Sequence, residues 1–371
     1  MLFIGTCRMA SEEKDARFRG PLSYPQDVRS LRAKTGTAAQ GELALLAGIR
    51  ARAARVSRSG LTLGIGDDCA LLALRREEEL AVTTDLSIAG RHFRLDWHSP
   101  ESVGHRALAR GLSDLAAMGA RPVAAFLSLG LPRELTQGAG RRPAWVQGFL
   151  SGLLALAEAH KTPLAGGDLA ESPIAVADIV LTGAVPQGRA LLRSGARPGH
   201  LLYVTGDLGG AAVGLSQLAG LAAKLPNRPG PPRIPKNLAA LLAPHLFPQP
   251  RIAQGLFLQR RRIGSAALDI SDGLSTDLTR LCQESGVAAE VDAAALPLHP
   301  GATLDQALHG GEDYELLFTA PATTRLPRSI AGVPVTRIGR ILKAGAGQPA
   351  VTLITPHGPV PLEPQGWEHF A

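Results

Sequence analysis

Cysteine is scarce in this 371-residue sequence: Cys7, Cys69 and Cys282 lie far apart, and none belongs to a Cys-x-x-Cys pair. An odd number of cysteines without zinc spacing argues against both a disulfide framework and a structural zinc site. Aromatic residues make up only 4% of the chain, which leaves little surface on which nucleic-acid bases could stack. The sequence therefore disfavours a disulfide-stabilised domain, a zinc-binding domain and a nucleic-acid binder.

Long apolar runs are also missing. The nearest approach to a run of 18 uncharged apolar residues, 208–223, is interrupted by Gly, Ser and Gln, so we expect no membrane span. The first fourteen residues contain too short an apolar stretch for a signal peptide, and acidic residues follow at once. We expect a cytoplasmic protein without membrane contact.

Charge is present in moderate excess. Lys+Arg 39 against Asp+Glu 32 gives a formal net charge of +7, and only six of the basic residues are lysine. Arginine suits bidentate recognition of phosphate, but here the arginines are scattered along the chain. A solvated basic surface is the simpler interpretation, and a phosphorylated small molecule is the alternative.

The length suggests two domains, at roughly 150 residues per domain. Apolar strand patterns at 80–85, 123–131 and 174–185 alternate with helical patterns, and the same alternation resumes at 200–206. Ser99 and Pro100 predict the start of one helix, and GGEDYELLFTAP (310–321) predicts a further strand. The proline-rich segment 225–236 predicts a surface loop. We predict an α/β fold, more closely an α+β layered one, with a Gly-, Pro- and Arg-rich boundary at 185–199. The predicted parts are an extension at 1–40, an N-terminal domain at 41–190 and a C-terminal domain at 191–371.

Aspartates recur at strand ends and within one apolar helix, at Asp67, Asp68, Asp85, Asp114, Asp168, Asp269 and Asp272. Each alone is an ordinary turn or cap residue. If they converge, each close pair repels by about 4 kcal/mol at an effective dielectric constant of 20, and cations must offset that repulsion. Oxygen ligands without Cys or His select Mg²⁺ or Mn²⁺, so the pattern predicts a site for hard divalent cations.

Other candidate residues each admit two interpretations. His92 follows the 80–85 strand closely enough to line the same site, or it is an exposed loop residue. Arg193 contacts phosphate or is solvated in a linker, and Trp367 stacks on a ring or belongs to a docked tail. The glycine-rich GDLGGAAVG (206–214) cradles a phosphate or allows close helix packing. No Walker A loop and no protein-kinase motif set is present.

Taken in order, the motifs resemble those of thiamine-monophosphate kinase, in the PurM-like ATP-using superfamily. The matching stretches are GELALLA, LGIGDDCALL, VTTD with GRHF, ALARGLSDLAAMGARP, LAGGD, GRALLRSGARPG, DISDGLSTDL, GGEDYELLF and GWEHF. They extend over residues 41–370, which is nearly the whole chain outside the N-terminal extension. The resemblance implies a two-domain PurM-like fold and transfer of the γ-phosphoryl group of ATP to thiamine monophosphate.

The resemblance also implies roles for particular residues. Several Mg²⁺ ions would be held by Asp68, Thr83, Thr84, Asp85, Asp114, Asp168, Asp269 and Asp272. ATP would be contacted by His160, Gly167, Asp168, Arg193 and Ser271, and thiamine monophosphate by His92, Glu312 and Trp367. A homodimer formed through the sheet of the N-terminal domain is implied, with no nucleic-acid partner.

This chemistry agrees with the absence of an obvious His or Cys nucleophile. The acceptor is a phosphate monoester, already ionised near neutral pH, so no catalytic general base is expected. What the reaction needs is neutralisation of two polyanions approaching in line, which Mg²⁺ ions held by aspartates provide.

The chain departs from the family pattern at four positions. Leu86 replaces a hydroxyl residue after the metal-binding strand, and Gly111 stands where Asn is usual. His160 stands where Tyr is frequent near the adenine, and Trp367 where Tyr or Phe is frequent. None of these changes removes a carboxylate, so we expect them to affect nucleotide preference and KM but not the existence of activity.

Three alternatives are left. The nearest is another PurM-like ATP-dependent synthetase, of the aminoimidazole ribonucleotide or selenophosphate type, although Cys7 lacks the Gly-rich setting expected of the latter. A nucleic-acid binder would show a basic face and steep salt dependence of binding. A degenerate nucleotide-binding regulator would have lost aspartates, and this chain has not lost them.

Overall fold

The computed structural model describes residues 42–56, 60–65, 69–138, 144–224 and 230–367. Asp67, Asp68 and the predicted extension at 1–40 therefore lie outside the described residues. Residues 39–371 form one compact unit by their contacts, and this unit holds every element below. None of the described helices is both long and apolar enough to cross a membrane.

The α-helices are α1 (Glu42–Ala53), α2 (Pro100–Ala117), α3 (Trp145–Ala159), α4 (Gly210–Ala223), α5 (Ala239–Leu246), α6 (Ile252–Arg261), α7 (Leu274–Ser285) and α8 (Leu304–His309). Short 3₁₀ helices are η1 (Arg133–Thr136), η2 (Arg193–Gly195), η3 (Lys236–Leu238) and η4 (Ala293–Ala295). The strands are β1 (Leu61–Leu63), β2 (Leu71–Leu72), β3 (Glu78–Ile88), β4 (Arg121–Leu131), β5 (Leu164–Glu171), β6 (Val176–Pro186), β7 (His200–Thr205), β8 (Ala266–Asp269), β9 (Val287–Asp292), β10 (Leu316–Pro321), β11 (Ser329–Ile330), β12 (Val333–Lys343), β13 (Val351–Thr355) and β14 (Gly358–Pro361).

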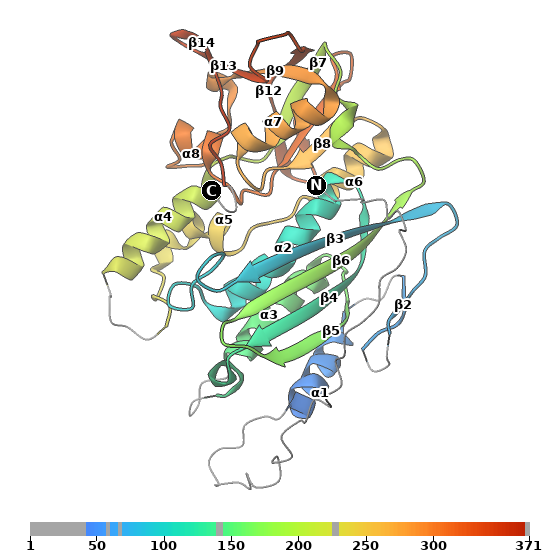
Figure 1. Cartoon of the computed structure of the whole chain (residues 1–371), viewed down its shortest axis with the longest axis vertical. Helices are drawn as coiled ribbons and strands as arrows, with labels where there is room; N and C mark the ends of the chain where they lie inside the picture. The colour runs from blue at the N-terminus through green and yellow to red at the C-terminus, as the bar shows by residue number, and fades with distance from the viewer. Residues whose placement is uncertain (1–41, 57–59, 66–68, 139–143, 225–229, 368–371) are drawn as a thin grey trace, which may run out of the picture. The chain divides into compact units, whose positions relative to one another are not determined.

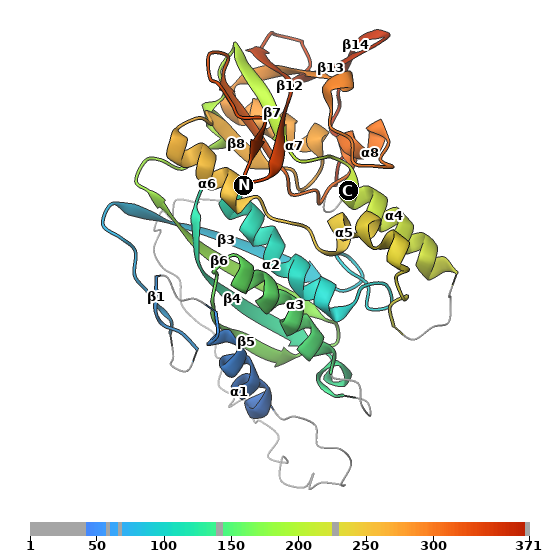
Figure 2. The same ribbon diagram turned by 180° about the vertical axis from the view of Figure 1, so that it is seen from behind.

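A four-stranded sheet is built in the order β3-β6-β4-β5. Its β3–β6 and β6–β4 pairs are antiparallel, and its β4–β5 pair is parallel. Helices α2 and α3 cover one face of this sheet, as Figures 1 and 2 show from opposite sides. Because side chains alternate along a strand, Thr83 and Asp85 of β3 face these helices while Thr84 and Leu86 face away.

Helix α2 begins where the sequence predicts. Ser99 is the N-cap, its side chain accepting the Ser102 N–H at 3.2 Å, and Pro100 occupies the first turn. The helix lies close to α3 because glycines stand at the crossing: a Cβ on Gly104 would lie 1.9 Å from the carbonyl oxygen of Phe149. This close crossing buries most of α2, and with it the side chains that α2 directs toward the sheet.

A larger, eight-stranded sheet follows in the order β14-β13-β9-β12-β7-β10-β8, with β11 paired to β12 outside that path. It is antiparallel except where β13 runs parallel to β9. Leu274, Leu278 and Leu281 of α7 are fully buried in the same core as the apolar residues of β8 and β9. Strand β8 ends at Asp269, and the turn between β8 and α7 carries Ser271 and Asp272.

The layered α/β fold predicted from the sequence is confirmed, with differences in detail. LAGGD lies within strand β5, where the sequence analysis predicted no strand. The predicted strand at GGEDYELLFTAP begins only at Leu316, and Gly310–Glu315 is a loop. Residues 230–235 of the proline-rich segment have no helix or strand, as predicted; the other prolines of that segment, Pro226 and Pro229, lie outside the described residues.

Candidate active site

One cavity of about 530 Å³ collects side chains from β3, α2, the β8–α7 turn, the Gly310–Tyr314 loop and the C-terminal segment. Its volume lies in the range of small-molecule sites. The predicted residues that line it are Asp85, His92, Asp114, Asp269, Ser271, Asp272, Glu312 and Trp367. Residues up to 282 positions apart in sequence thus meet at one place.

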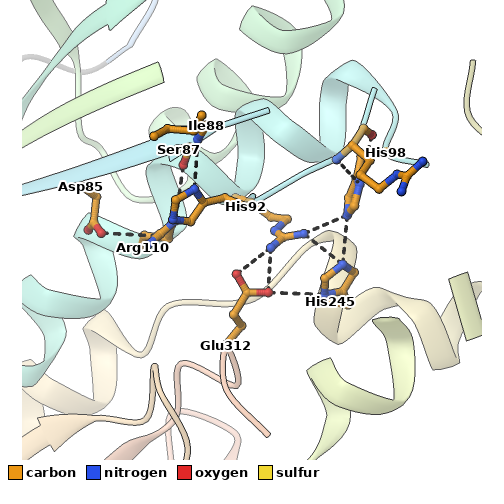
Figure 3. A network of polar contacts seen from close by, with 10 residues as sticks. Asp85, Ser87, Ile88, His92, His98, Arg110, His245 and Glu312 are labelled. Atoms are coloured by element: carbon orange, nitrogen blue, oxygen red, sulfur yellow. Dashed lines mark hydrogen bonds and ion pairs between the residues drawn. The ribbon is translucent and has the colours of Figure 1, made fainter. Parts of the chain in front are cut away.

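Helix α2 and strand β3 supply the first pair of acids. Thr83 Oγ1 donates a short hydrogen bond to Asp114 Oδ2. Asp85 Oδ1 pairs with Arg110 Nε at 3.3 Å, one turn earlier on α2 (Figure 3). Gly111 permits this packing, because a Cβ there would lie 2.6 Å from Leu181 and 3.5 Å from the methyl group of Thr83.

The β8–α7 turn supplies the second pair. Asp269 is buried, and its Oδ2 accepts a hydrogen bond from Ser113 Oγ at 2.6 Å, next to Asp114 on α2. Asp272 pairs with Arg280 of α7. The turn itself is held by Asp277, whose Oδ2 accepts the backbone N–H groups of Ser271, Asp272 and Gly273 at 2.9–3.1 Å.

Burial and mutual repulsion make these carboxylates costly to ionise. Burial raises the pKa of Asp85 to about 6, with the neighbouring charge of Asp114 adding to the rise and Arg110 opposing it. Burial also raises the pKa of Asp114, and burial followed by the charge of Asp114 raises that of Asp269 well above its usual value. The fold thus gathers negative charge that it does not fully neutralise, an arrangement common at functional sites.

The remaining wall of the cavity is basic and aromatic. It is formed by Arg91, Phe93, Arg94, Trp97, Arg106, Arg110 and Tyr314. The guanidinium of Arg94 lies 4.6 Å from the ring centre of Trp97, a cation–π contact. One cavity therefore combines carboxylates, called the acidic wall below (Asp85, Asp114, Asp269 and Asp272), with guanidinium and ring surfaces.

The GGEDYE loop is strained where it meets the cavity. Glu312 and Tyr314 have φ values of 66° and 52°, in the left-handed region that non-glycine residues rarely adopt. The loop is fixed because the Glu312 N–H donates to the Ser271 carbonyl oxygen at 2.8 Å, and the Asp313 carboxylate accepts the N–H groups of Gly209 and Ala211. Asp313 thereby occupies the start of α4, which favours the packing interpretation of GDLGGAAVG.

The C-terminal segment is docked against the β8–α7 turn. The Trp367 N–H donates to the Asp272 carbonyl oxygen at 3.0 Å, and the Gly366 N–H donates to Thr276 Oγ1 at 3.0 Å. A Cβ on Gly366 would lie 1.9 Å from the Asp272 carbonyl oxygen, so glycine is required for this approach. Trp367 is 48% exposed and lines the cavity, so the tail is docked, while stacking of the indole on a ring stays a prediction.

The donor chemistry of the acidic wall fits Mg²⁺. Among the described residues, no three His, Cys, Asp or Glu side chains gather around a single point. Mg²⁺ is ordinarily bound through one or two carboxylates, waters and substrate phosphates and not through an all-protein cage. Separate carboxylates that line one cavity, without Cys, match that mode of binding.

Comparison with known proteins identifies the family. Residues 66–187 match the family model of the AIR synthase related protein, N-terminal domain. The thiamine-monophosphate kinase of Escherichia coli strain K12 is 40% identical over 343 residues, covering 89% of this chain and 98% of the relative. This chain belongs to the thiamine-monophosphate kinase family.

Solved structures of the thiamine-monophosphate kinase family share the fold. The crystal structure from Stenotrophomonas maltophilia is 38% identical, with a TM-score of 0.71 over 84% of this chain and 96% of that chain. A structure described as AaThiL complexed with AMPPCP and TMP is 29% identical, with a TM-score of 0.67 over 91% of this chain and 99% of that chain. The two-domain PurM-like α/β architecture follows from these matches.

The remaining residues that the kinase resemblance implicated lie away from the lining of the cavity. Thr84 is exposed on the opposite face of β3, and Leu86 lies on that face too, so the Leu86 departure takes no side chain from the cavity. Gly167 and Asp168 are on β5, at the other edge of the sheet from β3. His160 is the C-cap of α3, and Arg193 lies in η2, near enough to lower the pKa of Asp114.

Sequence reasoning missed the residues that hold the site together. Asp277 fixes the β8–α7 turn, Arg106 pairs with the Glu312 carboxylate, and His98 and His245 lie against Arg106. Asp277 carried a local signal, since an acid in the first turn of a helix often caps the preceding turn. The two histidines are 147 positions apart and carried no such signal.

Proposed function

We propose that this chain transfers the γ-phosphoryl group of ATP directly to thiamine monophosphate, forming thiamine diphosphate and ADP. The observation that carries the proposal is one cavity lined both by Asp85, Asp114, Asp269 and Asp272 and by arginine and aromatic side chains. A kinase that joins two phosphates needs charge neutralisation and alignment more than proton transfer. The family relationship supports the same reaction, because its curated relatives bear the name thiamine-monophosphate kinase.

The chain's own groups align the reactants. The acceptor phosphate is ionised near neutral pH and attacks without a general base. This agrees with the lowered pKa values of His98 and His245 in the cavity, which burial makes weak proton acceptors. Arg110, held against Asp85, and Arg91 present fixed positive charge near the acidic wall. These guanidinium groups suit phosphate oxygens because their donors are planar and permanently charged.

We propose that Mg²⁺ is held by Asp85, Asp114, Asp269 and Asp272, with Thr83 orienting Asp114. Mg²⁺ would supply charge neutralisation and a template for the phosphates. Asp68, Thr84 and Asp168 remain proposed metal ligands on the strength of the family resemblance alone. Ser113 and Asp277 act on the ligands themselves, because Ser113 fixes Asp269 and Asp277 fixes the turn that carries Asp272.

At the substrate end we propose that His92, Glu312 and Trp367 contact thiamine monophosphate. All three line the cavity, and the Trp367 indole offers a face for a thiamine ring. The carboxylate of Glu312 suits a ring that carries positive charge. His92 Nδ1 accepts the Ile88 N–H at 3.1 Å, which fixes the ring beside the cavity (Figure 3).

For ATP we propose contacts from Ser271 and Arg193, supported by the place of Ser271 in the cavity and by the electrostatic influence of Arg193 on Asp114. Contacts from His160 and Gly167 rest on the family resemblance alone. Gly167 has a φ of +145°, and a Cβ there would lie 1.9 Å from the Leu127 carbonyl oxygen, so β5 needs glycine at this position whatever it binds.

We also propose a homodimer formed through the open face of the four-stranded sheet. Leu80, Val82 and Leu86 are 46–58% exposed at alternate positions of the edge strand β3, away from α2 and α3. Exposed apolar side chains on an edge strand favour association with another surface. The domains are proposed to divide near residue 190, between the strands of the two sheets, in a cytoplasmic enzyme supplied with ATP and Mg²⁺.

Product analysis separates this proposal from its nearest alternative. A kinase converts ATP and thiamine monophosphate into thiamine diphosphate and ADP without releasing inorganic phosphate, whereas an ATP-dependent synthetase of the aminoimidazole ribonucleotide type releases it. We expect thiamine diphosphate and ADP in equal amounts, and no product when thiamine replaces its monophosphate. Phosphate release with aminoimidazole ribonucleotide precursor, and no thiamine diphosphate, would favour the synthetase.

A further inference from the structure

A buried arginine on α2, Arg106, lies between one carboxylate and two histidine rings. Arg106 Nη2 donates to both carboxylate oxygens of Glu312, at 2.6 and 2.7 Å. Its Nη1 lies 3.0 Å from His98 Nε2 and 3.0 Å from His245 Nε2 (Figure 3). Arg106, His98 and His245 are each no more than 6% exposed. The guanidinium is therefore held on one side by the histidines and holds the Glu312 carboxylate on the other.

Both histidine rings are neutral in this setting. Burial, with the Arg106 charge as the next cause, lowers the pKa of His98 to about 4 and that of His245 well below its usual value. A guanidinium only donates hydrogen bonds, so at least one of the two Nε2 atoms that face Nη1, which lie 3.0 Å from each other, must accept from it. His245 Nδ1 lies 3.5 Å from Glu312 Oε2, and the carboxylate attracts the ring proton to that nitrogen. The network thus assigns the Nδ1–H tautomer to His245, with Nε2 as the acceptor.

The four residues come from separate parts of the chain. His98 precedes α2, Arg106 lies within it, His245 lies in α5, and Glu312 lies in the GGEDYE loop before β10. Glu312 also has the strained φ of 66°, and such a conformation persists only where the surroundings determine it. The ion pair with Arg106 and the rings of His98 and His245, which lie outside the loop, hold Glu312 in this conformation.

We propose that His98 and His245 are positioning residues: they orient Arg106, and Arg106 fixes the Glu312 carboxylate for binding thiamine monophosphate. The inference rests on the proposed function for the identity of the ligand. The inference goes beyond the proposed function because it assigns the orientation of Glu312 to three buried residues that the proposed function gives no role. Losing this orientation should weaken the binding of thiamine monophosphate. ATP binding should stay intact, because the aspartates of the acidic wall are held by Thr83 and Ser113 and not by Arg106.

Steady-state kinetics of the full chain, with ATP and thiamine monophosphate varied separately, tests the inference. His245→Leu removes the acceptor for Arg106 and is expected to raise KM for thiamine monophosphate by about tenfold, with KM for ATP within about twofold of wild type. His245→Gln places an amide oxygen near the former Nε2 and is expected to recover most of the loss.

His105→Leu is the matched control. His105 is buried, adjoins Arg106 on α2 and donates to the Pro248 carbonyl oxygen at 2.7 Å, but does not contact the network. The His105→Leu variant therefore loses a buried histidine hydrogen bond, but we expect neither KM to change. If His245→Leu and His105→Leu behave alike, or if both KM values rise together in His245→Leu, His245 is merely structural and the inference is wrong.

A second measurement judges the geometry without catalysis. Nitrogen-15 NMR of histidine-labelled wild-type protein is expected to show His245 protonated on Nδ1 and bare on Nε2, without titration between pH 8 and 6. An Nε2–H tautomer, or titration in that range, would overturn the inference even in an active enzyme. A wild type that makes no thiamine diphosphate but shows the Nδ1–H tautomer would instead refute the proposed function and uphold the Arg106 geometry.

Discussion

At the scale of single residues, the aspartates separate by what surrounds them. Asp114 and Asp269 lie in one buried region, where the charge of Asp114 makes Asp269 harder to ionise. Asp168, in contrast, lies exposed on β5. The sequence showed that carboxylates recur beside strand ends, but a strand end does not reveal which face of the sheet a side chain takes. Thr83 and Thr84 illustrate this, since adjacent residues of β3 take opposite faces.

Asp114→Asn tests the acidic wall. The amide keeps the shape and can still accept from Thr83, but it removes the negative charge that a cation needs. We expect kcat to fall by at least about 100-fold. The free energy of unfolding should be unchanged or higher, because a buried carboxylate with a raised pKa is replaced by a neutral group.

Asp305→Asn, at an exposed position of α8 outside the cavity, serves as the control for Asp114→Asn and should keep wild-type kcat. Wild-type turnover by Asp114→Asn, measured as thiamine diphosphate formed per enzyme, would mean that Asp114 is only a structural residue of α2.

His98 gives a dependence of stability on pH with a definite sign. Its pKa is about 4 in the folded protein against 6.5 as the usual value, so the unfolded chain binds more protons between these values. Above pH 6.5 His98 is neutral in both states and does not affect the free energy of unfolding. As the pH falls from 6.5 toward 4, the unfolded chain takes up a proton that the folded protein does not, so the free energy of unfolding decreases. Between pH 6.5 and 5.5 this effect lowers the free energy of unfolding by about 1 kcal/mol.

Urea unfolding of His98→Gln at these two pH values should therefore show a smaller loss of stability on acidification than wild type. His357→Gln, at an exposed turn, should follow the wild type. An identical pH dependence in wild type and His98→Gln would contradict the buried neutral ring.

At the scale of elements, local signals were read correctly and distant pairings were not. The start of α2 depends on two adjacent residues, Ser99 and Pro100, so the sequence predicted it. The strands after Pro321 and the register of the larger sheet depend on partners far along the chain, such as β13 against β9. The Arg106–Glu312 ion pair joins residues 206 positions apart, and no local sequence pattern predicts it.

The crossing of α2 and α3 makes a prediction about glycine. Gly104→Ala would place a Cβ 1.9 Å from the Phe149 carbonyl oxygen, so the two helices must separate, and we expect a loss of about 3 kcal/mol in the free energy of unfolding. Gly220→Ala, in the exposed part of α4 with nothing within 4 Å of the added Cβ, should instead gain up to about 1 kcal/mol. Urea denaturation of both variants checks this, and equal effects would show that the close crossing is wrong.

At the scale of the whole molecule, the net charge of +7 was a poor guide to the site. The cavity draws on Asp85, Asp114, Asp269 and Asp272, residues of the minority sign, and among the arginines of the described residues Arg91, Arg94, Arg106 and Arg110 line it. The two-sheet architecture explains why: α2 lies on the smaller sheet, and Ser113 of α2 hydrogen-bonds to Asp269 of the larger one. Motif order revealed the family, but only folding shows which motifs meet.

The proposed dimer is tested by Val82→Glu, which places a charge at the most exposed of the three apolar positions on β3. We expect light scattering to give the mass of a dimer for wild type and of a monomer for the variant, since burying an unpaired carboxylate at an interface is costly. Val360→Glu on β14, 42% exposed at the edge of the larger sheet, is the matched control and should stay dimeric. A monomeric wild type would contradict the dimer.

The central claim is that the cavity lined by Asp114, Asp272, Glu312 and Trp367 phosphorylates thiamine monophosphate. The most direct measurement mixes purified protein with ATP, thiamine monophosphate and Mg²⁺ and quantifies the products by chromatography. We predict one thiamine diphosphate for each ADP, and loss of both when Mg²⁺ is chelated. Folded protein that forms no thiamine diphosphate under these conditions would contradict the claim.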